Sequence, residues 1–183
     1  VELVDLSNAP IVTTLTARGV VPDSHPNNLG MPGMHGTVPA VAALQKSDLI
    51  VALGARFDDR VTGKVSDFAP NAKVIHIDID PAEIDKNIPS SIGLAGDMKT
   101  ILQLLMKPES LHHTEEWLKN IRQWRTKYTY DYDAGDLSVP WAMHHVALAT
   151  AGKPYSFATD VGQHQMWTAQ FYKFKNPRTL LTS

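Results

Sequence analysis

Short apolar runs alternate with amphipathic stretches between residues 10 and 107, and this alternation constrains the fold more than any other feature of the sequence. It favours parallel strands, because a parallel pair needs a long crossover connection, which is usually a helix. The pattern therefore predicts an α/β fold, in which a parallel sheet is joined by helical crossovers. The expected strands cover residues 11–15, 49–53, 73–79 and 92–95, and the expected helices cover residues 37–46 and 98–106.

Two of these segments carry more specific signals. Thr37 can cap the helix that follows it, and Pro39 suits a first helical turn. Residues 49–53 are all apolar, which is typical of a strand whose two sheet faces are both covered. The helix over residues 98–106 is expected to bury Ile101, Leu102 and Leu105.

The same strand and helix pattern resumes after a different middle section. Trp117, Ile121, Trp124 and Tyr128 recur at helical spacing, so one face of that segment is expected to pack on another element. The polar run 131–136 is expected to be a linker. The elements expected after it are a helix over 138–151, a strand over 155–158, a helix over 163–172 and a final strand.

The composition excludes several classes of protein. The 183 residues are 43% apolar and 20% charged, as in ordinary globular proteins. A net charge of −2 argues against a nucleic-acid or membrane-surface partner. The chain has no cysteine, which excludes disulfide and thiolate chemistry. No basic region of a signal peptide opens the sequence, so we expect a cytoplasmic protein, and both ends read as cut from a longer chain.

The charged turn after residues 49–53 is the strongest candidate for a site. Ligands of open α/β sheets bind beyond the carboxyl ends of the strands, and Gly54 opens that end to close approach. Arg56 and Arg60 could bind phosphate or carboxylate, and Asp58 and Asp59 could orient them. The alternative interpretation is a solvated charged turn.

Two glycine-containing turns precede helices and could bind anions at the helix N-termini. In the first, Gly33 and Gly36 flank Met34 and His35 and would let a phosphate or ribose approach the backbone. In the second, Val161 and Gly162 precede Gln163 and His164, whose side chains can donate hydrogen bonds. Taken alone, each motif is more typical of an ordinary turn before a helix.

Acidic residues follow the next two expected strands. Asp78 is the best candidate to accept a hydrogen bond from an adenosine ribose, and Glu83 is the second. Asp80 is expected to cap a helix that begins at Pro81. Asp97 repeats the arrangement after the following strand, which points to a dinucleotide across one edge of the sheet, although the usual Gly-x-Gly-x-x-Gly turn is absent from the sequence.

The histidine pairs are poor candidates for a metal site. His112–His113 and His144–His145 lie in expected helices, where adjacent residues point in different directions. We therefore expect no metal ligands among them.

Taken together, these motifs resemble the catalytic subunit of the acetohydroxyacid synthase (acetolactate synthase) family, which belongs to the thiamine-diphosphate enzymes. The order and spacing of the motifs match that family over nearly the whole chain. The motifs lie at residues 22–25, 29–38, 54–64, 76–80 and 162–167.

The resemblance implies three domains of α/β type, two of them represented here. Residues 1–107 would be part of the central FAD-binding domain, 108–137 a helical linker, and 138–183 the start of the thiamine-diphosphate domain. The implied FAD contacts are Thr14, Leu15, Met34, His35, Gly54, Arg56, Asp58, Arg60, Asp78, Glu83 and Asp97. The implied thiamine-diphosphate contacts are Val161, Gly162, Gln163 and His164.

The resemblance also implies an activity. Such an enzyme condenses two 2-keto acids, pyruvate with pyruvate or 2-ketobutyrate, with loss of carbon dioxide, in the first common step of branched-chain amino-acid biosynthesis. Arg60 would meet the carboxylate of the second keto acid. FAD would be structural, and the magnesium ligands would lie outside this chain, which would be inactive alone. The expected assembly is a homo-oligomer with active sites between subunits and a possible small regulatory subunit.

Two positions depart from the family pattern. Asp85 stands where the family usually has glycine, and Thr16 replaces a customary methionine. Two alternative functions remain at this point: another thiamine-diphosphate enzyme (a decarboxylase, an oxidase or a glyoxylate carboligase), or a non-catalytic nucleotide-binding module.

Overall fold

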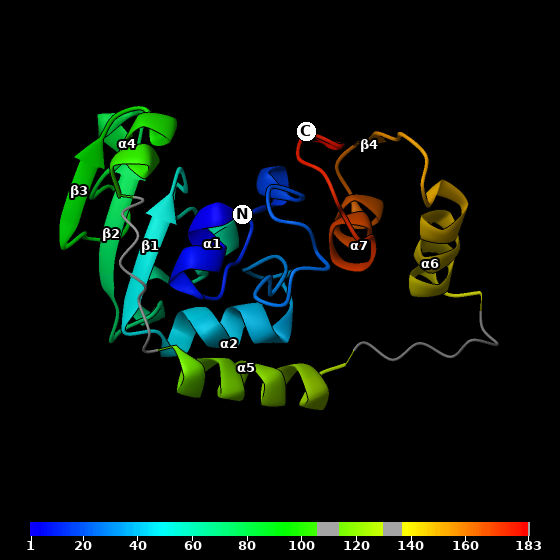
Figure 1. Ribbon diagram of the computed structural model, residues 1–183, viewed down its shortest axis with the longest axis horizontal. Coiled ribbons are helices and arrows are strands. Elements are labelled where there is room, and N and C mark those ends of the chain that lie inside the picture. The colour runs from blue at the N-terminus through cyan, green and yellow to red at the C-terminus, as the bar shows by residue number, and fades with distance from the viewer. Residues whose placement is uncertain (106–113, 130–136, 183) are drawn as a thin grey trace.

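The protein is an α/β structure with two parallel sheets, as the sequence predicts. The computed structural model describes residues 1–105, 114–129 and 137–182. The larger sheet has the order β1-β2-β3 and consists of β1 (Leu49–Leu53), β2 (Lys73–Asp78) and β3 (Ile92–Ala95). The smaller sheet pairs β4 (Phe157–Thr159) with β5 (Leu180–Thr182), and the two sheets lie at opposite sides of the molecule in Figure 1.

The helices connect and cover these strands. The α-helices are α1 (Glu2–Ser7), α2 (Val38–Lys46), α3 (Asp59–Thr62), α4 (Met98–Leu105), α5 (Glu115–Lys127), α6 (Val139–Thr150) and α7 (Gln163–Phe171). The short 3-10 helices are η1 (Leu15–Ala17), η2 (Val65–Asp67) and η3 (Pro81–Glu83). The expected cap of α2 is confirmed, because the Thr37 hydroxyl accepts a hydrogen bond from the Ala40 amide at 3.2 Å.

Within the described residues one face of the larger sheet is buried, and the other is covered only around Ile77, which is fully buried. Ile50 and Ala52 of β1 and Val74 of β2 pack with Phe57 and Phe68 in a single apolar cluster. On the opposite face, Leu49 and Val51 of β1 remain 49% and 45% exposed, and Ile92 of β3 is 50% exposed. The expectation that both faces of this strand are covered is therefore wrong for the described part of the chain.

Three further expectations need correction. Residues 11–15 form a single bridge, between Ile11 and Asn28, instead of a strand, and the chain enters the 3-10 helix η1 at Leu15. Helix α4 buries none of the three residues expected, because Ile101 and Leu102 are half-buried and Leu105 is 52% exposed. The strand expected at residues 155–158 is shifted to β4, where the Phe157 amide bonds to the Thr179 carbonyl oxygen at 2.7 Å.

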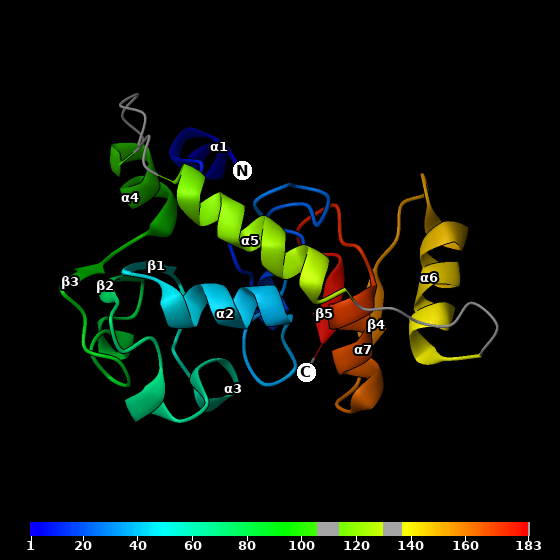
Figure 2. The ribbon, with the colours of Figure 1, turned by 90° about the horizontal axis from the view of Figure 1, so that it is seen from below.

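Helix α5 packs along α2, and Figure 2 shows the two lying side by side. Leu118 and Ile121 of α5 join Ala40 and Ala43 of α2 in one buried cluster. Trp117 and Trp124 pack against this cluster, and their two rings meet edge to face. Three of the four residues predicted to form a packed face, Trp117, Ile121 and Trp124, therefore do so. The fourth, Tyr128, is 41% exposed. The linker expected at residues 131–136 lies outside the described residues.

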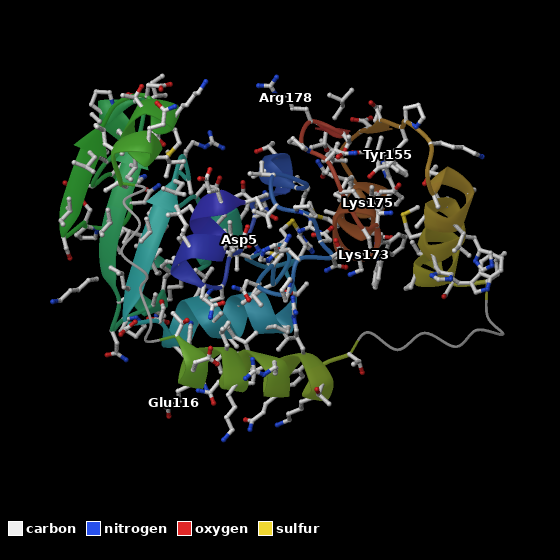
Figure 3. The ribbon with its side chains drawn as sticks, viewed as in Figure 1. Asp5, Glu116, Tyr155, Lys173, Lys175 and Arg178 are labelled. Carbon is white, nitrogen blue, oxygen red and sulfur yellow. The ribbon has the colours of Figure 1, made fainter. Side chains whose placement is uncertain are left out.

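The segment between α7 and β5 alternates buried aromatic and exposed basic residues. Tyr172 and Phe174 are 2% and 0% exposed and join Leu180 in a cluster. Lys173 and Lys175 are exposed, and Figure 3 labels both near α7. This period of two is typical of an extended segment with one buried face. No helix among the described residues has the length and apolar character needed to span a bilayer.

Candidate functional site

The register of the larger sheet brings three predicted site positions to one edge. Leu53 pairs with Ile77, and Asp78 pairs with Ala95. The Gly54 amide donates to the Ile77 carbonyl oxygen at 2.8 Å, and the Gly96 amide donates to the Asp78 carbonyl oxygen at 2.9 Å. The ends of β1, β2 and β3 therefore present Gly54, Asp78 and Asp97 side by side, as expected for a parallel sheet.

The turn after β1 is held by an aromatic residue that sequence reasoning missed. Phe57 has a φ of +51°, a conformation that is rare for a bulky residue, and is 4% exposed. Its ring packs edge to face on Phe68 and on His76, with centroids 5.9 and 5.2 Å away. Burial of Phe57 forces its charged neighbours outward, so Arg56 and Arg60 are both exposed.

The charged residues of this turn also hold one another in place. Asp58 caps α3, because its Oδ1 accepts from the Val61 amide at 3.3 Å. Its Oδ2 lies 3.3 Å from Arg56 Nη2, in an exposed pair whose contribution to stability is small. At Gly54, with a φ of +63°, an added Cβ would meet only Met98 Cε at 3.9 Å, which leaves this strand end open to a ligand.

Asp78 and Glu83 lie together beyond β2. Asp78 is 7% exposed, and its Oδ1 accepts from the Asp80 amide at 2.9 Å. Asp80 caps η3 through the Ala82 amide at 2.9 Å, which confirms that prediction. Glu83 Oε1 pairs with Lys86 Nζ at 2.8 Å, whereas Oε2 is buried with no hydrogen-bond partner among the described residues. A buried carboxylate oxygen without a donor is costly, so this position fits a ligand that supplies a hydroxyl group.

Two acidic residues near this edge have structural partners of their own. Asp97 caps α4 by accepting from the Thr100 amide and from Thr100 Oγ1, both at 2.9 Å, and these bonds lower the pKa of Asp97. Asp85 has a φ of +61°, a left-handed conformation that suits glycine. Its Oδ1 accepts from Ser90 Oγ and the Ser90 amide at 2.6 Å, and both bonds lower the pKa of Asp85.

The loop 31–37 packs against the charged turn. Gly33 has a φ of +90°, and a Cβ there would come within 1.9 Å of the Arg60 carbonyl oxygen. The Met34 amide donates to that same oxygen at 3.3 Å. Gly33 therefore permits a close backbone approach that brings Met34 and His35 beside Arg60.

The helix that follows this loop is not an open anion site. Thr37 caps α2 with its own hydroxyl, and its amide donates to the Met31 carbonyl oxygen at 2.9 Å. The Met34 amide is engaged as well, so a ligand at this loop would meet side chains more than backbone donors.

Thr14 and Leu15 lie apart from the sheet edge. Thr14 precedes η1, and Leu15 packs against the cluster around Phe174.

Helix α7 has no side-chain cap at its N-terminus, in contrast to α2 and α6. Thr37 and Ser138 cap α2 and α6, whereas Gly162 at the start of α7 provides no side-chain cap. Its φ is +153°, and a Cβ there would lie 3.0 Å from the His164 ring. The nine residues of α7 thus present an uncapped N-terminus with Gln163 and His164 exposed beside it, an arrangement that fits a phosphate group. The described residues contain no group of three or more side chains suited to hold a metal ion.

Comparison with known proteins agrees with this arrangement. The family described as "Thiamine pyrophosphate enzyme, central domain" matches residues 1–105. "Acetolactate synthase" of Mycobacterium bovis is 49% identical over 100% of this chain and 31% of its own length. "Acetolactate synthase large subunit" of Corynebacterium glutamicum is 45% identical over 98% of this chain and 30% of its own.

A more distant relative extends the likeness. "Probable acetolactate synthase large subunit" of Methanococcus aeolicus is 38% identical over 100% of this chain and 33% of its own length. The chain thus spans about a third of the length of the curated relatives that it matches. Since the family match covers more than half of the 183 residues, the chain belongs to the thiamine pyrophosphate enzyme family, with residues 1–105 forming its central-domain region.

Proposed function

We propose that this chain is a segment of the large catalytic subunit of an acetolactate synthase. The observation that carries the proposal is the extent of the similarity, which continues beyond the central-domain match at residue 105 through α7 at 49% identity. A stand-alone nucleotide-binding module would account for the larger sheet, but not for the second sheet with the uncapped helix α7. Domain limits of 1–107, 108–137 and 138–183 are part of the proposal.

The site residues would divide their work between two cofactors. Gly54, Arg56, Asp78 and Glu83 would hold FAD along the sheet edge, and the residues at the start of α7 would hold the diphosphate of thiamine diphosphate. When bound, the thiamine group supplies the carbon nucleophile that joins the two keto acids. Arg60 would orient the carboxylate of the second keto acid through its planar guanidinium. Magnesium would be bound by residues elsewhere in the subunit.

The partly uncovered face of the larger sheet supports a place within a larger protein. Leu49, Val51 and Ile92 expose apolar surface on one face of the sheet, and such surface is normally covered. We propose that other parts of the subunit cover it, and that the subunits assemble into a homo-oligomer that a small regulatory subunit can join. A cytoplasmic location is also proposed.

The full-length protein that carries this chain is expected to make acetolactate from pyruvate when given thiamine diphosphate and magnesium. It should also purify yellow, with flavin released on denaturation. Acetolactate can be measured as acetoin after acid decarboxylation, with acetaldehyde and tartronate semialdehyde (from glyoxylate) measured in parallel. A folded, colourless protein that forms no acetolactate, or one that forms only the other products, would contradict the proposal.

Arg56→Ala and Asp78→Ala are expected to weaken FAD binding to that protein about tenfold or more, because each removes a charged hydrogen-bonding group from the sheet edge. The measurement is FAD affinity of the flavin-free protein by fluorescence quenching. Lys64→Ala and Asp67→Ala are matched controls, since Lys64 and Asp67 form an exposed pair at 3.0 Å and are not among the predicted FAD contacts. Unchanged FAD affinity in the two test variants would remove those residues from the site.

A further inference from the structure

The side chain of Gln170 joins the loop 31–37 to helix α7. Gln170 Nε2 donates a hydrogen bond to the backbone oxygen of His35, which lies 135 residues earlier in the sequence. The other side of the loop is held by the charged turn, through the bond from the Met34 amide to the Arg60 carbonyl oxygen at 3.3 Å. The loop is therefore fixed between Arg60 and α7.

Gln170 lies on the same face of α7 as one of the residues proposed to bind the diphosphate. Gln163 is seven residues earlier, which is two helical turns, so the two side chains share a face about 10 Å apart along the axis. The backbone of His35, which with Met34 is a proposed flavin contact of the loop, thus meets the helix two turns below its uncapped start. The bond from Gln170 is a direct polar link between these two groups.

A separate set of bonds keeps the C-terminal end of α7 docked. The Asp23 amide donates to the Phe174 carbonyl oxygen at 2.9 Å, and the Phe174 amide donates to Asp23 Oδ2 at 2.8 Å. The Phe174 side chain is fully buried. Because these contacts do not involve Gln170, a substitution at Gln170 can remove its bond without detaching the segment.

We propose that Gln170 is a positioning residue that couples the flavin site to the thiamine-diphosphate site, an inference that rests on the proposed function. When FAD binds, it orders Met34 and His35 and so fixes the backbone oxygen of His35. Gln170 donates its hydrogen bond to that oxygen, and this hydrogen bond sets the position of α7. Binding linkage is reciprocal, so the factor by which FAD tightens the binding of thiamine diphosphate equals the factor by which thiamine diphosphate tightens the binding of FAD. A fivefold effect lies at the lower end of couplings of this kind.

The experiment measures the affinity of the full-length flavin-free protein for FAD by fluorescence quenching, with and without saturating thiamine diphosphate and magnesium. In the unmodified protein, the cofactor is expected to lower the dissociation constant for FAD about fivefold. In Gln170→Ala and in Gln170→Glu, the two dissociation constants are expected to agree within twofold. Glutamate keeps the size of the side chain but has no N–H to donate, so it separates the hydrogen bond from packing.

Gln123→Ala is the matched control, because Gln123 is an exposed glutamine on α5. It should keep the fivefold ratio. A purely structural role of Gln170 would weaken FAD binding by the same factor in both conditions and leave the ratio unchanged, which would overturn the inference. A ratio near one in the unmodified protein would overturn it as well. If the unmodified protein binds neither cofactor, both the proposed function and the inference are wrong. If it binds both cofactors and the Gln170 variants keep the fivefold ratio, only the inference is wrong.

Discussion

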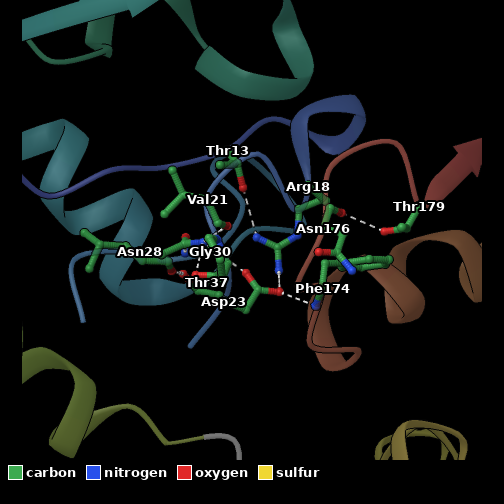
Figure 4. Close-up of polar contacts among 12 residues, drawn as sticks. Thr13, Arg18, Val21, Asp23, Asn28, Gly30, Thr37, Phe174, Asn176 and Thr179 are labelled. Atoms are coloured by element: carbon green, nitrogen blue, oxygen red, sulfur yellow. Dashed lines mark hydrogen bonds and ion pairs between the residues drawn. The ribbon is translucent and has the colours of Figure 1, made fainter. Parts of the chain in front are cut away.

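Replacing Asp23 with alanine is expected to lower the free energy of unfolding by about 3–5 kcal/mol, because it leaves a buried arginine without its counter-charge. The side chains of Arg18 and Asp23 are only 2% and 4% exposed, and Arg18 Nη2 lies 2.6 Å from Asp23 Oδ2. Burial lowers the pKa of Arg18, and the Asp23 carboxylate opposes that effect. Figure 4 shows Asp23 at the centre of this network.

The same carboxylate has two further partners, which adds to the expected loss. Asp23 Oδ1 accepts from Asn28 Nδ2 at 3.1 Å, and Oδ2 accepts from the Phe174 amide at 2.8 Å. Removing it therefore takes an acceptor from Arg18 and from the Phe174 amide, and each loss carries a desolvation cost, whereas Asn28 Nδ2 keeps the carbonyl oxygens of Val21 and Pro22. The bond to Phe174 joins segments 151 residues apart, so its loss also loosens the C-terminal part of the chain.

Urea unfolding followed by circular dichroism measures this effect. Asp67→Ala is the matched control, because Asp67 pairs with Lys64 where both side chains are more than 60% exposed, and its loss should cost less than about 1 kcal/mol. Adding Arg18→Met to Asp23→Ala should recover part of the lost stability, because no buried charge then remains unpaired. Equal urea midpoints for Asp23→Ala and Asp67→Ala would show that the buried pair contributes little.

The sheet edge was predictable because its signals are local. The runs at residues 49–53 and 92–95 coincide with β1 and β3, since a short apolar segment bounded by polar turns has few other ways to fold. Parallel pairing then places the residues after each strand at one edge, so the grouping of Gly54, Asp78 and Asp97 follows from topology. The capping residues Thr37, Asp80 and Ser138 were predictable for the same reason.

Contacts between distant segments were not predictable in this way. Nothing near Arg18 signals that it pairs inside the protein with Asp23, or that Asp23 binds Phe174. The bond from Gln170 to His35 is equally invisible, because a helical glutamine usually faces solvent. Phe57 could have been suspected, since a large apolar residue amid four charged ones needs a place to be buried. Asp97 caps α4 through one carboxylate oxygen, a local role that leaves its predicted contact with a ligand as a prediction.

Gly33→Ala is expected to destabilise the chain by about 3 kcal/mol or more, because two penalties act at once. A residue with a side chain is strained at the φ of +90°, and its Cβ would lie 1.9 Å from the Arg60 carbonyl oxygen, so the backbone must move. Gly152→Ala isolates the first penalty: its φ is +72° and nothing lies within 4 Å of the added Cβ, so it should cost only about 1 kcal/mol. Urea midpoints of the two variants give the comparison.

Because the displaced backbone belongs to the loop that holds Met34 and His35 beside Arg60, Gly33→Ala should also weaken FAD binding in the full-length protein, whereas Gly152→Ala should not. Equal losses of stability in the two variants would mean that the loop yields to the methyl group, and that its contact with the charged turn does not fix the site.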